Sequence, residues 1–239
     1  MAISFIEDDL RFDFGDEWRV MKWDREPVYV EGMRKANQGK GVDFIGIHDG
    51  RSLFFIEVKD YSEEVRNEEE KGPVEHVFEL KVRSTVAALV GARRRGGYPE
   101  CTPILDALVA RQKLRLVLWR EEGIQTSLSQ IVMEKRRTAR GSSDIRSRLR
   151  RVRWLDVEIM RTSLYVDYTK DVPDLRVSRL PRTRRTKVDQ VLATLRSRFS
   201  LPDSILWKIK DTEDEGLLDH WIQQAPTIGS PWKLLQIRS

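Results

Sequence analysis

Residues 41–60 read GVDFIGIHDGRSLFFIEVKD, and this segment sets the expected fold. Val42–Ile47 and Leu53–Val58 are rich in Val, Ile and Phe, residues that favour strands. Asp49 and Gly50 lie between these runs, and an Asp-Gly pair is a strong short-range hairpin signal because glycine readily takes a positive φ. We therefore predict two adjacent antiparallel strands.

Three charged residues, Asp43, Glu57 and Lys59, interrupt this apolar hairpin. Successive strand side chains point to opposite faces, so Glu57 and Lys59 share one face and Val58 points to the other. We expect one functional face and one core face. Asp43 is expected roughly opposite Glu57, within a residue of register, and cross-strand neighbours lie about 4.5–5.5 Å apart at Cβ. Two carboxylates at that range repel each other unless a cation lies between them.

The residue types indicate a metal site. Hard oxygen ligands that leave room for water and a substrate phosphate suit Mg²⁺ or Mn²⁺. We predict that Asp43 and Glu57 hold the metal, with the Val58 carbonyl as an additional ligand. Lys59 is expected to position the attacking water or to neutralise charge in the transition state, which is chemistry for cutting a phosphodiester. The alternative is a salt bridge between Asp43 and Lys59 at a strand end, with Glu57 solvated.

This arrangement resembles the PD-(D/E)XK nuclease superfamily, which includes many restriction and DNA-repair endonucleases. The resemblance consists of Asp43, a hairpin and then Glu57-Val58-Lys59, and it covers roughly residues 15–95. Val42 stands where the superfamily is named for a proline. The resemblance implies Mg²⁺-dependent hydrolysis of DNA in restriction, anti-phage defence or DNA repair.

Many enzymes of this superfamily have a further acidic residue on a helix before the motif, which assists metal or substrate binding. The sequence predicts such a helix from Asp24 to about Asn37, because Asp24 can cap it and Pro27 is tolerated in its first turn. Glu31 and Glu26 are the candidates, and Glu31 is preferred because it lies mid-helix and closer to the strand. An exposed helix glutamate is the default interpretation of both.

Composition limits the class of protein. Cys101 is the single cysteine, which excludes an internal disulfide and a cysteine-based zinc site and indicates a reducing compartment. No apolar run approaches the roughly 20 residues that span a bilayer, and the first residues lack the pattern of a signal peptide. No Gly-x-x-x-x-Gly-Lys-Ser/Thr loop is present, so any use of ATP requires a partner protein. We expect a cytoplasmic protein with no membrane partner.

The net charge of +5 is unevenly distributed. Residues 1–80 contain 11 Lys and Arg against 20 Asp and Glu, whereas residues 81–239 contain 32 against 18. Such basic charge favours a nucleic-acid partner, because phosphate neutralisation supplies most of the affinity. The densest run, residues 135–153, holds nine basic residues, and arginine suits bidentate phosphate contacts. The candidate nucleic-acid-binding residues are Arg136, Arg137, Arg140, Arg148, Arg150 and Arg151.

A second basic run is an alternative nucleic-acid groove. Its residues are Arg176, Arg179, Arg182, Arg184, Arg185 and Lys187. Charge alone gives neither run sequence specificity, because phosphate contacts position the protein on the nucleic acid whereas base contacts determine which sequence is bound. DNA is expected as the substrate, with RNA less favoured, and a homodimer or another protein partner stays open. The other interpretation of the charge is a solvated surface.

The remaining periodicity predicts an α/β fold, with a mixed central β-sheet flanked by helices over residues 1–171. From residue 172 the strand signal fades, and helical stripes favour a smaller α-helical region at residues 172–239. We expect strands at residues 10–14, 18–23, 114–119 and 154–160, and helices at residues 74–94, 101–111, 187–199 and 216–224.

Lys81 and Arg83 lie off the apolar stripe of the helix predicted at residues 74–94. Either can reach a phosphate if this helix borders the site, but a surface position is favoured.

Two functions compete with a nuclease. The first is a non-catalytic module that keeps the nuclease fold to bind nucleic acid or a partner. The intact set of two acids and a lysine argues against it, since a module freed from catalysis has no reason to keep like charges together. The second is a structural protein whose basic half docks an acidic partner.

Overall fold

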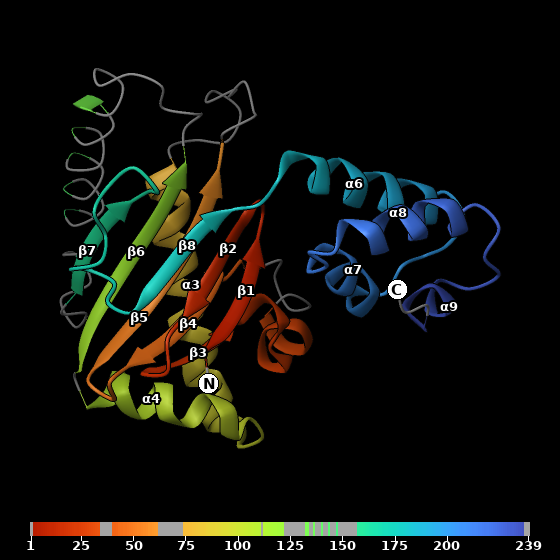
Figure 1. The fold of residues 1–239 in the computed structure, drawn as a ribbon. Coiled ribbons are helices and arrows are strands. Elements are labelled where there is room, and N and C mark those ends of the chain that lie inside the picture. Colours follow the sequence, from red (N-terminus) through yellow and green to blue (C-terminus); the bar gives the residue numbers. More distant parts are fainter. Residues whose placement is uncertain are drawn as a thin grey trace. The chain divides into compact units, whose positions relative to one another are not determined.

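The computed structural model describes residues 2–33, 40–61, 74–110, 112–121 and 157–236, with a few isolated positions between 132 and 147. The fold is mixed α/β, with two β-sheets and several helices (Figure 1). The chain forms two compact units. The sequence placed a boundary near residue 171. In the structure the first unit is Asp13–Arg176 with Met1–Ile3, and the second is Ser4–Phe12 with Val177–Ser239.

A five-stranded mixed sheet organises the first unit, in the order β3-β4-β5-β6-β7. The first three strands are antiparallel neighbours, whereas β5, β6 and β7 are parallel. Parallel neighbours need a crossover, and between β5 and β6 the helices α3 (Val74–Arg95) and α4 (Thr102–Val109) lie in it. The strands are β3 (Trp18–Lys22), β4 (Phe44–His48), β5 (Ser52–Asp60), β6 (Lys113–Glu121) and β7 (Val157–Thr162).

The predicted hairpin is confirmed. Phe44 of β4 lies opposite Ile56 of β5, and the Asp43 N–H donates to the Ile56 carbonyl at 3.0 Å. Asp49 and Gly50 both have positive φ, 50° and 62°, as a tight hairpin turn requires. The strands expected at residues 18–23 and 114–119 and the helix expected at 74–94 are confirmed as β3, β6 and α3.

Both faces of the sheet are covered, so the expectation of a single core face is wrong. Figure 1 shows α3 lying behind the sheet. The apolar strand residues on that face and the apolar residues of the helix form one buried cluster. On the other face the Trp18 ring packs against Phe54, with 4.7 Å between centroids, and Phe14 packs against Phe44. The buried residues between sheet and helix include Ile45, Ile47, Leu53, Phe55, Phe78, Val82, Val86 and Leu89.

The helix predicted from Asp24 is wrong in its first half. Trp23–Arg25 form only a short 3₁₀ turn, η1, and Glu26 is extended with φ −69° and ψ 138°. Pro27 explains this break, because proline disfavours the helical conformation of the residue before it. A π-helical turn, η2 (Val28–Met33), follows. The predicted end near Asn37 lies outside the described residues.

The second unit contains a helical core. The stripe expected from residues 187–199 belongs to α6 (Arg182–Arg196), and the helix expected at 216–224 is α8 (Glu215–Gln224). Two further helices, α7 (Asp203–Lys210) and α9 (Pro231–Gln236), complete this core.

A three-stranded sheet adds two strands that the sequence did not predict. Its order is β1 (Ile3–Glu7), β2 (Leu10–Phe14) and β8 (Leu175–Arg179). Only β2 was expected. The loss of strand signal after residue 172 was therefore misleading, because β8 is a five-residue strand held by pairing with a distant segment.

Within the described parts of the chain, no helix has the length and apolar character needed to cross a bilayer.

Candidate functional site

Two buried carboxylates meet where β4 begins and β5 approaches its end. Asp43 directly precedes β4, and its Oδ2 accepts a hydrogen bond from the Val58 N–H at 2.7 Å. Glu57 lies on β5 and is 1% exposed, while Asp43 is 9% exposed. The backbone N–H of β5 thus fixes the orientation of the Asp43 side chain beside Glu57.

Lys59 joins this pair from the same face of β5. Its Nζ lies 2.8 Å from Glu57 Oε1, and the side chain remains 28% exposed. The structure therefore brings Asp43, Glu57 and Lys59 together, as the hairpin register predicts. The alternative with a solvated Glu57 is wrong, because the residue is buried and is itself the ion-pair partner of Lys59.

A fourth charged residue, Lys81 of α3, completes the cluster. Its Nζ lies 2.5 Å from Glu57 Oε1 and 3.6 Å from Asp43 Oδ1. The expectation of a surface position is wrong for Lys81, which is buried, and correct for Arg83, which is exposed. A signal was present in the sequence: Lys81 lies three residues after the core residue Phe78, and residues so spaced share a helix face.

Thr85, one turn further along α3, ties the helix to the strand that carries Asp43. Its Oγ1 accepts a hydrogen bond from the Val42 N–H at 3.1 Å and donates to the Lys81 carbonyl at 2.8 Å. The hydroxyl therefore links the backbone next to Asp43 with the backbone of Lys81. The sequence alone did not single out Thr85.

Burial dominates the electrostatics of Asp43. Loss of solvent raises the pKa of its carboxyl to about 7, and the charge of Glu57 adds to this rise. The ammonium groups of Lys81 and Lys59 and the Val58 N–H act in the opposite direction. Asp43 therefore exchanges its proton near neutral pH.

The two carboxylate oxygens of Glu57 differ in their contacts. Both lysines contact Oε1, whereas the buried Oε2 has no hydrogen-bond partner among the described residues. Leaving a buried acceptor unsatisfied costs about 1–3 kcal/mol, and more for a charged group. A ligand that binds this oxygen would remove that cost.

The donor set fits a hard divalent cation. The carboxylates of Asp43 and Glu57 supply oxygen, the atom that Mg²⁺ and Mn²⁺ prefer, and Glu57 Oε2 is available. No group of three His, Cys, Asp or Glu side chains suited to a metal occurs in the described ranges. The other ligands would be water, substrate oxygen or a backbone carbonyl, which suits Mg²⁺ because it retains several waters. The Val58 carbonyl stays a prediction.

The upstream glutamates do not add a third carboxylate to the pair. Glu31 lies exposed in η2, and among the described residues it forms no three-acid group with Asp43 and Glu57. Glu26 has Glu100 as its charged neighbour. Burial, and to a smaller extent the charge of Glu100, raise the pKa of the Glu26 carboxyl. An assisting role for Glu31 or Glu26 stays a prediction.

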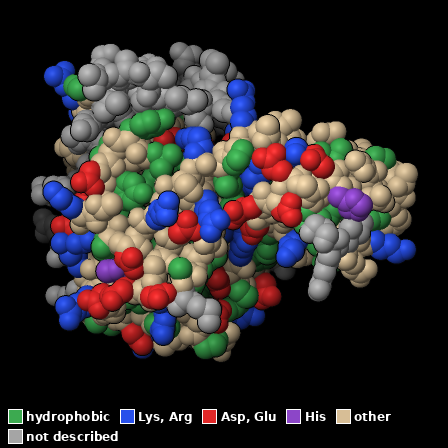
Figure 2. Space-filling view, viewed as in Figure 1, with side chains coloured by type: hydrophobic (Ala, Val, Ile, Leu, Met, Phe, Trp, Pro, Cys, Tyr) green, Lys and Arg blue, Asp and Glu red, His purple; other side chains and the backbone are tan. Residues whose placement is uncertain are grey.

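The first basic run falls mostly outside the described residues. Arg136 and Arg140 are described and exposed. On the surface visible in Figure 2, the described acidic and basic side chains are interspersed. Nucleic-acid binding by this run stays a prediction. The other predicted contacts, which lie outside the described residues, are Arg137, Arg148, Arg150 and Arg151.

Part of the second basic run has an internal role. Arg184 is 2% exposed and donates to the last carbonyl of α7 and to the Thr212 carbonyl. Arg185 pairs with Asp9 at 2.9 Å, and Lys187 pairs with two acidic residues of α8. These three side chains therefore have structural partners within the second unit. Nucleic-acid binding by this run stays a prediction.

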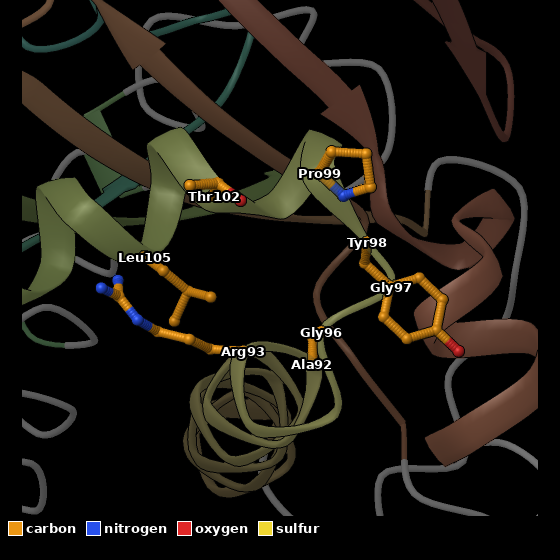
Figure 3. A pocket seen from close by; sticks show the side chains of 8 residues that line it. All are labelled: Ala92, Arg93, Gly96, Gly97, Tyr98, Pro99, Thr102 and Leu105. Atoms are coloured by element: carbon orange, nitrogen blue, oxygen red, sulfur yellow. The ribbon is translucent and has the colours of Figure 1, made fainter.

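A pocket at the end of α3 is separate from the carboxylate cluster. Figure 3 shows Arg93 extending from α3 toward Leu105 of α4, with Tyr98 on the other side. The pocket has a volume of about 430 Å³, and Arg93 is paired with Asp106 at 2.6 Å. Arg93 lies twelve residues after Lys81, which is about 18 Å along a helix. None of the clustered charges lines it.

Comparison of the chain with protein-family models, curated proteins and solved structures found no match. Function must therefore be inferred from the residues and their geometry.

Proposed function

We propose that the protein is a Mg²⁺-dependent deoxyribonuclease with a core resembling the PD-(D/E)XK nucleases, acting in restriction, anti-phage defence or DNA repair. The main support is the buried pair Asp43 and Glu57, which shares its site with Lys59 and in which Glu57 Oε2 has no hydrogen-bond partner within the described part of the chain. Buried like charges are costly, and such a site is more readily explained by chemistry than by stability.

Each residue has a distinct role in this proposal. Asp43, oriented by the Val58 N–H, and Glu57 hold the metal. When bound, Mg²⁺ supplies a Lewis acid that polarises the phosphate and lowers the pKa of water. Lys59 is the more exposed lysine of the cluster, and its ammonium orients the attacking water or stabilises the charge that develops on the phosphate.

Two arginines near the carboxyl ends of the parallel strands support the proposal of a phosphate-bearing substrate. Lys59 on β5 lies next to Arg120 on β6, and Leu118, which lies next to Glu57, pairs with Arg161 on β7. Arg120 follows Leu118 by two residues and therefore lies on the same face of the sheet. The charged residues on this face are Glu57, Lys59, Arg120 and Arg161. Ligands of α/β sheets commonly bind outside the carboxyl ends of parallel strands, where these residues lie.

Cleavage assays test the proposal directly. Purified protein with Mg²⁺ or Mn²⁺ is expected to nick or cut plasmid or single-stranded DNA. Asp43→Asn and Lys59→Met should each abolish this activity. Lys113→Met, at the opposite end of the parallel strands, should retain it, since that lysine pairs with Glu158 at the surface. Wild-type rates in both site variants would reject the nuclease assignment.

One observation favours a non-catalytic binding module as the second candidate. When both carboxyl groups are ionised, Lys59 and Lys81 together balance the charges of Asp43 and Glu57, so these four side chains need no metal for neutrality. In the sequence analysis, Lys59 was the one lysine assigned to the carboxylate pair, and a cation between the carboxylates was expected to offset their repulsion. Absence of divalent-metal binding in calorimetry, with DNA affinity retained, would support this module.

A further inference from the structure

Lys81 occupies the space between the two carboxylates. Its Nζ contacts Glu57 Oε1 at 2.5 Å and lies 3.6 Å from Asp43 Oδ1, and Lys59 Nζ lies 2.8 Å from the same Glu57 oxygen. A cation shared by Asp43 and Glu57 would need to approach the same pair of side chains. The ammonium of Lys81 lies close to both carboxylates and would therefore compete with such a cation.

The charge balance of the cluster also indicates that Lys81 opposes the binding of a cation. With Asp43 ionised, the metal-free cluster contains two carboxylates and two ammonium groups. A divalent cation would add two positive charges to this buried site. Lys81 is largely withdrawn from solvent, so its repulsion of the cation is weakly screened. Its four-carbon stem is flexible, which allows the ammonium to move away from Glu57.

We infer that Lys81 acts as an internal counter-ion that takes the place of the divalent cation and is displaced from Glu57 when a cation binds. This inference rests on the proposed metal-dependent function. It makes Lys81 a positioning residue: it keeps the two carboxylates together in the metal-free protein and lowers their affinity for metal.

Mn²⁺ affinity tests this competition without an activity assay. Isothermal titration of the full-length protein with MnCl₂ should show at least about tenfold tighter binding in Lys81→Gln than in the wild type, because an adjacent buried positive charge is removed. Arg83→Gln is the matched control: this exposed side chain of α3 lies 3.9 Å from Glu79, and its removal should leave the affinity unchanged. Asp43→Asn should abolish binding in either background, which locates the metal.

The outcomes separate this inference from the proposed function. Unchanged or weaker binding by folded Lys81→Gln, with Asp43-dependent binding by the wild type, overturns the inference alone. Binding by Lys81→Gln but not by the wild type supports the inference and contradicts the nuclease proposal. Absence of binding in both proteins overturns both.

A second measurement uses the wild-type protein, in case the variant does not fold. Lys81 is expected to react slowly with an acetylating reagent in metal-free protein and several-fold faster with Mn²⁺, as followed by mass spectrometry. Lys113 serves as the exposed internal reference. Equal reactivity of Lys81 with and without Mn²⁺, under conditions where calorimetry shows Asp43-dependent binding, would overturn the inference.

Discussion

Asp43 and Glu57 carry the same functional group in different surroundings. Asp43 accepts a backbone hydrogen bond and has a second oxygen 3.6 Å from Lys81. Two lysines contact one oxygen of Glu57, and the other oxygen has no hydrogen-bond partner among the residues that the structure describes. Burial raises the pKa of the Asp43 carboxyl to about 7. In the proposed metal site, Glu57 Oε2 is the oxygen that would take the cation.

The raised pKa of Asp43 predicts a pH dependence of stability. Unfolded Asp43 ionises near its ordinary pKa of 3.8, whereas the folded protein keeps the proton up to about pH 7. The folded state binds more protons between these values, so the contribution of Asp43 to the free energy of unfolding falls as pH rises through this window. Urea denaturation of metal-free Asp43→Asn should show a flatter pH dependence than the wild type. The exposed variant Asp189→Asn should keep the wild-type slope, and an equal slope in Asp43→Asn would contradict the assignment.

At the scale of elements, the site depends on how α3 packs across the hairpin. Lys81 and Thr85 reach the strand segment around Asp43 because α3 lies on the face of the sheet that carries Glu57. The loop before β4 must also pass close to Trp23. A Cβ on Gly41 would lie 2.3 Å from Cδ1 of this buried ring, so the approach requires glycine.

Gly41→Ala is therefore expected to destabilise the protein by about 1–3 kcal/mol, the usual effect of overpacking a core. Gly91→Ala is the matched control, because nothing lies within 4 Å of the added Cβ and the position is in α3. It should be neutral or stabilising by up to about 1 kcal/mol. Chemical denaturation measures both, and a stable Gly41→Ala variant would show that the loop does not need this close approach.

At the scale of the whole molecule, charged residues have different roles in the two units. In the first unit, the charges of Asp43, Glu57, Lys59 and Lys81 converge on one buried cluster. In the second, Arg184 and its neighbours connect α6 to the end of α7, to α8 and to the N-terminal segment. The basic composition of the C-terminal half therefore contributes to folding as well as to any binding of nucleic acid.

Arg184→Met is expected to lower the free energy of unfolding by about 1–3 kcal/mol, because two carbonyls of the helical unit lose their donor. Arg196→Met, at the exposed end of the same helix, should change stability little. Thermal denaturation checks both variants. DNA affinity and its salt dependence should be the same for Arg184→Met and the wild type at a temperature where both are folded. A weaker salt dependence in Arg184→Met would instead place this arginine on a phosphate.

The sequence by itself determined the hairpin and the positions of Asp43, Glu57 and Lys59 on it. Strand alternation and the conformation of an Asp-Gly turn are local properties, so a segment of twenty residues contains enough information to align the side chains.

Only the tertiary structure decided which other residues join them. Lys81 is separated from Glu57 by 24 positions and meets it because α3 folds back over β5. The pairing of β1 and β2 with β8 and the contact between Asp9 and Arg185 span even longer separations. Local periodicity shows which face of an element is apolar, but the partner of that face is chosen by packing, which depends on the whole chain.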